Sequence, residues 1–244
     1  MKLGIQLYTV RDRLEEDFEG TLRAIKDMGY DGVEFAWMFG GKTPEELAKF
    51  VEQDLGLLVC GFHLKTAEAT NAKDPAWTYA LALKSPYVTV SLAGWVEERW
   101  DEAIATVKEA GKIAKKKGLQ FTYHHHAQEF ADKGGKYALD VLLEATDPEE
   151  VKLELDTYWI RKGGEDPVAY LRTKAGRVPQ LHVKDMAKDG SFAEVGEGEI
   201  DFPAVIEAAD EARVPWLIVE QDKCARPSIE SAEISAKNLK KMMG

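Results

Sequence analysis

The sequence predicts a closed (β/α)8 barrel, the α/β fold known as the TIM barrel, as a single domain over residues 1–244. Short apolar runs typical of buried parallel strands alternate with longer amphipathic stretches, which makes eight strand and helix units. Strands separated by helices pair in parallel through right-handed crossovers, and eight such units in 244 residues match the size of a closed barrel. An open doubly wound sheet is the alternative, but neither Gly40-Gly41 nor Gly163-Gly164 has the spacing of a phosphate-binding loop.

Local signals set the bounds of the elements. The helix over 18–28 ends at Gly29, because glycine readily adopts the left-handed conformation of a helix end. The helix over 43–55 begins with an N-cap, a first-turn proline and a capping-box glutamate in Thr43-Pro44-Glu45-Glu46. The predicted strands are 3–8, 32–35, 57–62, 87–91, 119–123, 151–155, 178–183 and 216–219, and the other helices are 75–84, 97–117, 136–145, 166–174, 202–212 and 227–242.

Composition excludes several classes of partner. The 43 acidic and 32 basic residues give a net charge of -11, which repels nucleic acid and anionic membranes. The sequence has no run of 18 apolar residues, and its first residues lead straight into a strand, so we expect no membrane or targeting segment. Cys60 and Cys224 are expected to be free thiols in a cytoplasmic protein. The expected partner is a small molecule, and homo-oligomerisation is left open.

All five histidines lie at or near the carboxyl ends of predicted strands, where TIM barrels place their active sites. Strand alternation directs His124 and His126 to one side and His125 to the other, toward the helical shell or solvent. His63 and His182 follow the same pattern on the third and seventh strands. Imidazole is the commonest protein ligand for transition metals and carries protons near neutral pH. A histidine-rich surface turn is the alternative for the run at 124–126.

Three carboxylates, Glu34, Asp156 and Glu220, also end apolar strands. Carboxylates in a barrel mouth are costly unless they are paired or bound to a cation, although each one singly is also explained as a helix cap or a satisfied core carboxylate. Mixed carboxylate and imidazole ligands suit transition metals better than Ca²⁺. We therefore expect one divalent ion, Mn²⁺ first, with Zn²⁺, Co²⁺, Fe²⁺ or Mg²⁺ as alternatives.

A divalent ion at the barrel mouth would favour chemistry that passes through an enediolate. A cation that chelates a carbonyl and its neighbouring hydroxyl acidifies the C–H between them, so that reprotonation gives isomerisation and loss of a β-hydroxyl gives dehydration. Glu220 and a histidine such as His126 are candidate bases. Lys184 is a third catalytic candidate, because it shares a strand face with His182 and can hold a substrate oxygen. The alternative for Lys184 is a salt bridge to Asp185 or Glu154.

Further polar and aromatic residues near the strand ends are expected to bind substrate. Tryptophans there offer apolar faces to sugar C–H groups, although core packing explains them equally well. Glu197 lies between glycines in a loop and reaches over the mouth, or else is an exposed turn residue. The candidates are Gln6, Glu34, His63, Trp159 and Glu197, with Trp37 and Trp95 as further walls of the pocket.

The motifs at these positions resemble the xylose isomerase-like TIM-barrel family, which contains sugar phosphate isomerases and epimerases, ketose 3-epimerases and inosose dehydratases. The resemblance covers essentially the whole chain and specifies the superfamily rather than the substrate. It is carried by Gly4-Ile5-Gln6-Leu7-Tyr8, Gly32-Val33-Glu34-Phe35, Tyr123-His124-His125-His126, Glu154-Leu155-Asp156-Thr157, Leu181-His182-Val183-Lys184-Asp185, Gly196-Glu197-Gly198 and Val219-Glu220-Gln221-Asp222.

The resemblance implies one divalent ion held at the ends of strands five to eight. Asp156, His182 and Glu220 match the ligands of strands six, seven and eight, and His124 takes the place of the strand-five glutamate of the epimerases. That glutamate is one of two bases in the 3-epimerases, so this chain departs from their pattern, and Tyr-His-x-His is familiar from the inosose dehydratase-like branch. Whether His124 or His126 is the strand-five ligand is left open.

The expected function is a metal-dependent isomerase or epimerase of a small sugar, sugar phosphate or polyol. A dehydratase of the inosose type is the first alternative, and a barrel that binds a ligand without catalysis is the second. Another branch of the family cleaves abasic DNA, but it needs an electropositive groove that a net charge of -11 does not favour.

Overall fold

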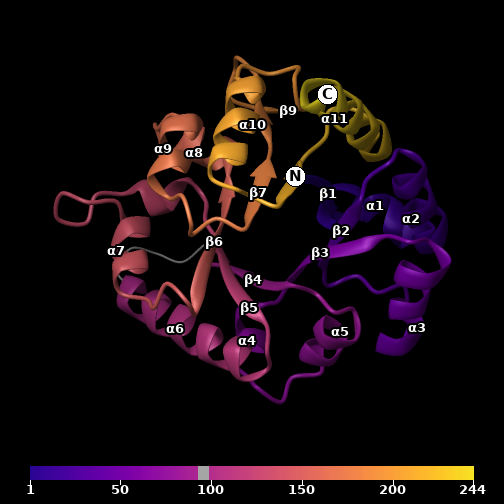
Figure 1. Cartoon of the computed structure of the whole chain (residues 1–244), viewed down its shortest axis with the longest axis horizontal. Coiled ribbons are helices and arrows are strands. Elements are labelled where there is room, and N and C mark those ends of the chain that lie inside the picture. Colours follow the sequence, from indigo (N-terminus) through magenta and orange to yellow (C-terminus); the bar gives the residue numbers. More distant parts are fainter. Residues whose placement is uncertain (93–98) are drawn as a thin grey trace.

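The computed structural model describes residues 1–92 and 99–244 and shows a closed eight-stranded barrel with helices around it (Figure 1). The strand order around the barrel is β1-β10-β7-β6-β5-β4-β3-β2, and every neighbouring pair is parallel. The predicted TIM barrel is therefore confirmed. Its strands are β1 (Lys2–Gln6), β2 (Gly32–Ala36), β3 (Leu58–His63), β4 (Tyr87–Ser91), β5 (Gln120–His124), β6 (Val151–Asp156), β7 (Gln180–Val183) and β10 (Trp216–Val219).

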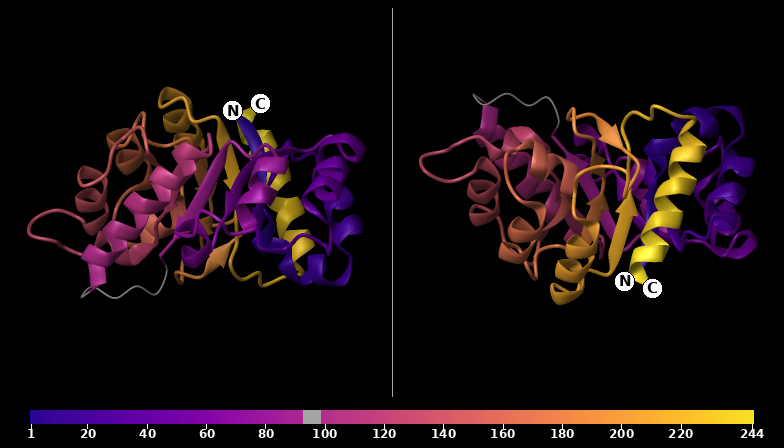
Figure 2. Two further views of the ribbon diagram at one scale, coloured as in Figure 1. Left: turned by 90° about the horizontal axis from the view of Figure 1, so that it is seen from below. Right: turned by 90° about the horizontal axis from the view of Figure 1, so that it is seen from above.

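The helices form an outer layer, and the two chain ends lie on the same side of the molecule (Figure 2). A short antiparallel pair, β8 (Asp185–Met186) with β9 (Phe192–Ala193), follows β7. The helices are α1 (Arg11–Glu16), α2 (Phe18–Asp27), α3 (Pro44–Ala48), α4 (Thr66–Ala69), α5 (Ala76–Ala82), α6 (Trp100–Lys116), α7 (Ala138–Glu144), α8 (Thr157–Lys162), α9 (Pro167–Thr173), α10 (Phe202–Glu211) and α11 (Ser228–Met243), with the 3-10 helices η1 (Leu7–Val10) and η4 (Ala127–Phe130) and the π-helix η2 (Lys49–Asp54).

The first strand is shorter than its sequence pattern suggests. It was expected over residues 3–8 but ends at Gln6, where the side chain accepts a hydrogen bond from the Tyr8 N–H at 3.1 Å. This contact caps the 3-10 helix η1, which continues into α1. Leu7 and Val10 are both buried, so their spacing is that of a helical turn rather than of a strand.

Capping signals place other helix starts correctly. The Thr43 hydroxyl accepts the Glu46 N–H, and the Glu46 carboxylate accepts the Thr43 N–H, as the capping box predicts. Gly29 follows α2 with φ of +80°, as expected for a left-handed helix end. The predicted helix over 97–117 is seen as α6 from Trp100, and its expected first residues, 97 and 98, lie outside the described residues.

Helix α8 was not predicted. Asp156 ends β6, and its Oδ1 accepts the N–H of Trp159 at 2.9 Å, so the same residue caps the helix that follows. Its first three residues, Thr157, Tyr158 and Trp159, have weak intrinsic helix propensity. The Asp156 cap and the burial of Thr157 and Tyr158 therefore stabilise α8 in spite of the weak helix propensity of its first residues.

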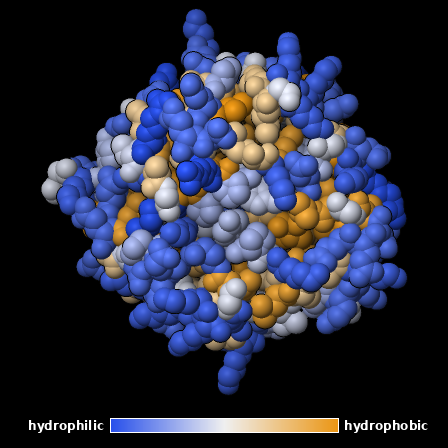
Figure 3. Space-filling view, in the orientation of Figure 1, coloured by the Kyte–Doolittle hydropathy of each residue, from blue (hydrophilic) through white to orange (hydrophobic). Residues whose placement is uncertain are grey.

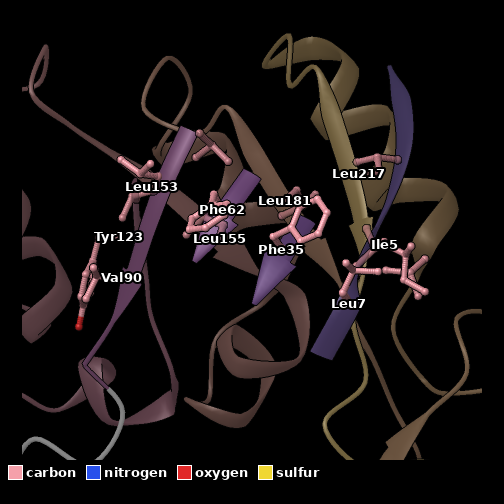
Figure 4. Packing of buried hydrophobic residues seen from close by; sticks show 14 of the residues in the cluster. Ile5, Leu7, Phe35, Phe62, Val90, Tyr123, Leu153, Leu155, Leu181 and Leu217 are labelled. Carbon is pink, nitrogen blue, oxygen red and sulfur yellow. The ribbon is translucent and has the colours of Figure 1, made fainter. Parts of the chain in front are cut away.

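Alternation along the strands separates an apolar shell from a polar barrel interior. Leu153 and Leu155 of β6 belong to the main hydrophobic core between the strands and the helices (Figure 4). Glu154 and Asp156 lie on the opposite face of the same strand. Glu154 meets His63 of β3 across the barrel, and Asp156 lies beside His182 of the neighbouring strand β7. Among the described residues, a small apolar cluster of Cys60 in β3 with Trp216 and Ile218 in β10 lies apart from the main core. The barrel interior therefore offers polar groups toward the ends of its strands.

The surface in Figure 3 is the side of the molecule seen in Figure 1; hydrophilic side chains dominate its rim, and hydrophobic residues reach the surface between them.

Within residues 1–92 and 99–244, no helix combines the length and apolarity that crossing a bilayer requires. Both cysteines are free thiols, as expected, with Cys60 fully buried.

Candidate metal centre

Four residues that were predicted as metal ligands lie together at the carboxyl ends of the strands. His124 and Asp156 end β5 and β6, His182 lies in β7, and Glu220 follows β10 directly. One ligand atom from each lies within 4.8 Å of the others, and all four residues are buried. We call these four residues the mouth group. Their convergence follows from the parallel barrel, in which neighbouring strands end at one face.

The mouth group fits a divalent cation. Among the described residues, His124 Nδ1 is a buried atom without a hydrogen bond, with Glu154 Oε2 3.4 Å away. Asp156 Oδ2 likewise has no hydrogen bond and faces the Lys184 ammonium at 3.0 Å. Buried polar atoms are costly unless something satisfies them, and a cation is a partner that a carboxylate oxygen and an imidazole nitrogen can share. Two imidazoles and two carboxylates are also the donor set expected for Mn²⁺, Fe²⁺, Co²⁺ or Zn²⁺.

Lys184 is buried against carboxylates of the mouth group and does not line the cavity. Its Nζ is 2.6 Å from Glu220 Oε2, 2.7 Å from Asp222 Oδ2 and 3.0 Å from Asp156 Oδ2, and the residue is 1% exposed. Burial alone lowers the pKa of this ammonium, but the three carboxylates outweigh burial and raise it. Lys184 is thus an internal cation paired with three carboxylates. It does not line the cavity, and the expected substrate contact stays a prediction.

The expected salt-bridge partners of Lys184 were also wrong. Asp185 instead accepts backbone N–H groups of Gly196 and Gly198, each at 2.9 Å, and so holds the loop that follows β9. Glu154 contacts histidines inside the barrel. Lys184 instead pairs with Asp156 at the end of β6 and with Glu220 and Asp222 after β10, the two strands that flank β7. These carboxylates are far from Lys184 in the sequence, so no local pattern indicates the pairs.

A second cluster lies inside the barrel and shares His182 with the mouth group. It consists of Glu34, His63, Glu154 and His182, and we call it the inner group. Glu34 Oε2 is 2.7 Å from His182 Nε2, and Glu154 Oε2 is 2.8 Å from His63 Nε2. Sequence reasoning did not select Glu154 as a site residue. The available signal was its place two residues before Asp156, on the same face of β6.

Burial and neighbouring charges shift the pKa values of the mouth-group residues in different directions. Burial raises the pKa of Asp156 to about 6 against the opposing charge of Lys184. Burial also favours a higher pKa for Glu220, but the charges of Lys184 and His182 outweigh burial and bring the Glu220 pKa well below its usual value. Burial and the neighbouring His182 bring the pKa of His124 well below its usual value, so His124 is neutral, the form that binds metals.

The inner group holds its histidines in the charged form when no cation is bound. Burial alone lowers the pKa of both rings, but Glu154 and Glu34 raise that of His63 to about 10, and Glu154, Glu220 and Glu34 raise that of His182 well above its usual value. Burial opposes ionisation of Glu34, yet the two imidazoles lower its pKa. The inner group is therefore a network of ion-paired hydrogen bonds.

The run of three histidines divides between two environments. His124 and His126 line the cavity at the mouth, and His126 Nδ1 lies 3.1 Å from the Ser91 hydroxyl. Burial and the charge of Lys184 lower the pKa of His126 to about 4, so its ring is neutral. His125 faces the helical shell, where its ring meets Phe130 edge to face and is fully buried rather than solvent-exposed.

The cavity above the mouth group has a volume of about 380 Å³. Gln6 and His63, both predicted to bind substrate, line it, whereas Glu34 is fully buried beneath it. The lining residues are Gln6, Tyr8, Ala36, Trp37, His63, Leu64, Lys65, Thr66, Ser91, His124, His126, Glu220 and Asp222.

The tryptophans and Glu197 differ in their relation to this cavity. Trp37 lines it with 42% of its surface exposed and with φ of +60°, an unusual backbone conformation for a bulky residue. Trp159 lies behind the lining, 4.8 Å from the ring of His126. Glu197 does not line the cavity but pairs with Arg226 at 2.7 Å, and Trp95 lies outside the described residues.

Comparison with known proteins agrees with this geometry. An inosose dehydratase of Clostridium tetani is 31% identical over 148 residues, 53% of this chain and 49% of that protein. The chain spans about half the length of the curated relatives it matches. A solved structure of a sugar phosphate isomerase/epimerase from Parabacteroides distasonis superposes with a TM-score of 0.82 at 25% identity, covering 98% of this chain and 93% of that one.

A more distant structure, of the IOLI protein with a zinc atom, has a TM-score of 0.76 at 16% identity and covers 99% of this chain and 98% of that one, which shows the shared fold. The family model for the xylose isomerase-like TIM barrel matches residues 22–242. This chain belongs to the xylose isomerase-like TIM-barrel family.

Proposed function

We propose that this protein is a divalent-metal-dependent enzyme that isomerises or epimerises a small sugar or polyol by proton transfer next to a carbonyl. The observation that carries the proposal is the mouth group, because two imidazoles and two carboxylates converge at the floor of a cavity of about 380 Å³. A cavity of that volume suits a small ligand. We propose His124, Asp156, His182 and Glu220 as the ligands of one divalent ion.

The ion would polarise the substrate carbonyl and stabilise the negative charge of an enediolate. Glu220 and His126 are the groups of this chain that we propose to move the proton, since both line the cavity. Glu220 is ionised and His126 is neutral, so each can accept a proton at neutral pH. Ser91 holds His126 through Nδ1, which leaves Nε2 as the nitrogen available to a substrate.

The cavity lining favours a substrate without a phosphate group. Among the lining residues that the structure describes, Lys65 is the sole lysine or arginine, and its side chain is 63% exposed. Glu220 and Asp222 also line the cavity, and both pair with the buried Lys184. A phosphate would therefore have one solvated cation as its partner among these lining residues, so we propose a neutral sugar or polyol ahead of a sugar phosphate.

Dehydration is the second candidate, and a specific observation supports it. The strand-five position holds His124 instead of a carboxylate, and the curated relatives at about 30% identity are named inosose dehydratases. Loss of a β-hydroxyl from the enediolate needs the same cation site and the same first proton transfer. The two outcomes therefore differ in the fate of the enediolate rather than in the mouth group.

Product analysis in D₂O tests the proposal. The protein is loaded with Mn²⁺ or Zn²⁺ and incubated with keto-sugars, sugar phosphates and inososes, and the products are followed by mass spectrometry and NMR. Deuterium at an α-carbon with unchanged elemental composition supports the isomerase, and loss of water supports the dehydratase. If no substrate of the panel exchanges a proton while the loaded protein binds it, the barrel only binds a ligand. Asp156→Ala, which removes one proposed ligand, is the control for exchange by free metal.

A further inference from the structure

The imidazole of His182 bridges the mouth group and the inner group through its two nitrogens. Nδ1 lies 2.9 Å from Glu220 Oε2 and 3.9 Å from Asp156 Oδ2. Nε2 lies 2.7 Å from Glu34 Oε2 and 3.3 Å from Glu154 Oε1. The ring therefore presents one nitrogen to the proposed ion and the other to buried carboxylates.

The hydrogen in the contact between Glu34 and His182 belongs to the imidazole. Two amides beside Glu34 are donors: Gln6 Nε2 donates to Oε2 at 2.8 Å, and Gln180 Nε2 donates to Oε1 at 2.8 Å. His63 Nε2 lies farther away, 3.4 Å from Oε2. Gln180 is fixed in this orientation because its Oε1 accepts the Thr122 hydroxyl at 2.9 Å. Both oxygens of Glu34 thus act as acceptors, and the N–H of His182 Nε2 completes the set.

A neutral imidazole has one protonated nitrogen and one nitrogen with a free lone pair. When Nε2 carries the hydrogen, Nδ1 is the nitrogen that can bind a cation, and it points at Glu220 and Asp156. A carboxylate that accepts the second N–H of a ligating histidine fixes its tautomer and ring orientation and strengthens it as a ligand. Glu34 occupies that place.

The inner group also has the composition of a metal site, which gives a competing account. A second ion on His182 Nε2, with the first on Nδ1, would require the ring to lose both protons. Contact lengths do not separate the two groups, because His182 Nδ1 is also at hydrogen-bond length from Glu220, 2.9 Å. The inner group differs in that both oxygens of Glu34 already accept amide N–H groups, from Gln6 and Gln180.

We propose that Glu34 is a positioning residue that holds His182 in its Nε2–H form and aims Nδ1 at the ion, so that the inner group supports one metal site and is not a second one. This proposal rests on the proposed metal site of the mouth group. It assigns Glu34 a role through His182, in place of the substrate contact that the sequence suggested.

Glu34→Gln tests the role, because it keeps the size of the side chain and replaces one acceptor oxygen with a donor. We expect Mn²⁺ affinity, measured by chelator competition, to fall about 10-fold to 100-fold, as is usual when the partner of a ligating histidine is lost. Glu129→Gln is the matched control. Glu129 is also a buried carboxylate with two donors, the Tyr123 hydroxyl and the His126 N–H, but it has no contact with the mouth group.

A second measurement needs no variant of Glu34 and remains decisive if Glu34→Gln does not fold. In Zn²⁺-loaded wild-type protein with ¹⁵N-labelled histidine, two-bond ¹H–¹⁵N correlations should show His182 with hydrogen on Nε2, with the signal assigned by its absence in His182→Gln. Two ions per chain, or unchanged Mn²⁺ affinity in Glu34→Gln, would overturn the proposal while leaving the mouth site in place. Hydrogen on Nδ1 would overturn the proposal and would also remove His182 from the ligands of the mouth site. A wild-type chain that binds no ion would overturn the mouth site itself.

Discussion

His125 Nε2 accepts a hydrogen bond from the backbone N–H of Asp156 at 3.1 Å, so the histidine that faces away from the cavity still fastens a residue of the mouth group. Its Nδ1 lies 3.1 Å from the carbonyl oxygen of His126 and donates to it. Both nitrogens of the neutral ring are therefore used, and a second proton would break the contact with Asp156. Burial lowers the pKa of His125 to about 3.

His125→Gln should make the free energy of unfolding depend less on pH between pH 7 and pH 4. Between the ordinary histidine pKa of 6.5 and the folded value of about 3, the unfolded chain binds a proton that the folded chain does not, so the free energy of unfolding falls as pH falls. One such group contributes a slope of up to about 1.4 kcal/mol per pH unit. Urea unfolding in chelator from pH 7 to pH 4 should show a shallower slope for the variant, and equal slopes would contradict the assignment.

Lys184→Met should destabilise the protein strongly in the absence of metal. The variant leaves Asp156, Glu220 and Asp222 without their shared cation, and breaking a buried ion pair on one side usually costs about 3–5 kcal/mol. Lys136→Met is the matched control, because Lys136 pairs with Glu144 at the exposed surface and its loss should cost about 1 kcal/mol or less. Similar unfolding free energies for the two variants would show that Lys184 is not a structural cation.

Trp37→Ala should weaken substrate binding more than catalysis. The indole lines the cavity, where an apolar face can pack against sugar C–H groups, and it meets the ring of Tyr8 edge to face at 6.3 Å. We expect KM to rise about tenfold, equal to about 1.4 kcal/mol, with kcat nearly unchanged. Leu81→Ala, at a residue that is 44% exposed and does not line the cavity, should leave both constants unchanged.

His124→Gln and His126→Gln should separate metal binding from proton transfer. His124 belongs to the mouth group, so its loss should lower Mn²⁺ affinity, whereas His126 lines the cavity and is held by Ser91, so its loss should lower α-proton exchange in D₂O with Mn²⁺ affinity preserved. The opposite pattern would make His126 the strand-five ligand.

The barrel could be predicted because its signal is repeated in every unit. Apolar runs, capping motifs such as Thr43 with Glu46, and helix-ending glycines such as Gly29 act locally and agree with the global fold. The structure differs from the predicted elements where the hydrogen bond of one side chain to the backbone ends a strand and begins a helix. Gln6 turns the end of β1 into η1, and Asp156 begins α8.

The candidate site was predictable to the extent that strand ends meet at one face of the barrel. That rule brought the mouth group together from four separate strands. It does not tell which side chains are buried, so it placed Lys184 and Glu34 at the cavity, although both are buried and neither lines it. Burial depends on register between strands and on long-range ion pairs such as Lys184 with Asp222, which no local pattern encodes.

The most direct test of the account is the Mn²⁺ content of wild-type protein and of Asp156→Ala, measured by elemental analysis after equilibrium dialysis. Asp156 also caps α8, so Asp166→Ala, which removes the equivalent cap of α9, controls for the loss of a helix cap. The account predicts one ion per chain in the wild type and in Asp166→Ala, and no stoichiometric ion in a folded Asp156→Ala. Wild-type metal content in Asp156→Ala would contradict it.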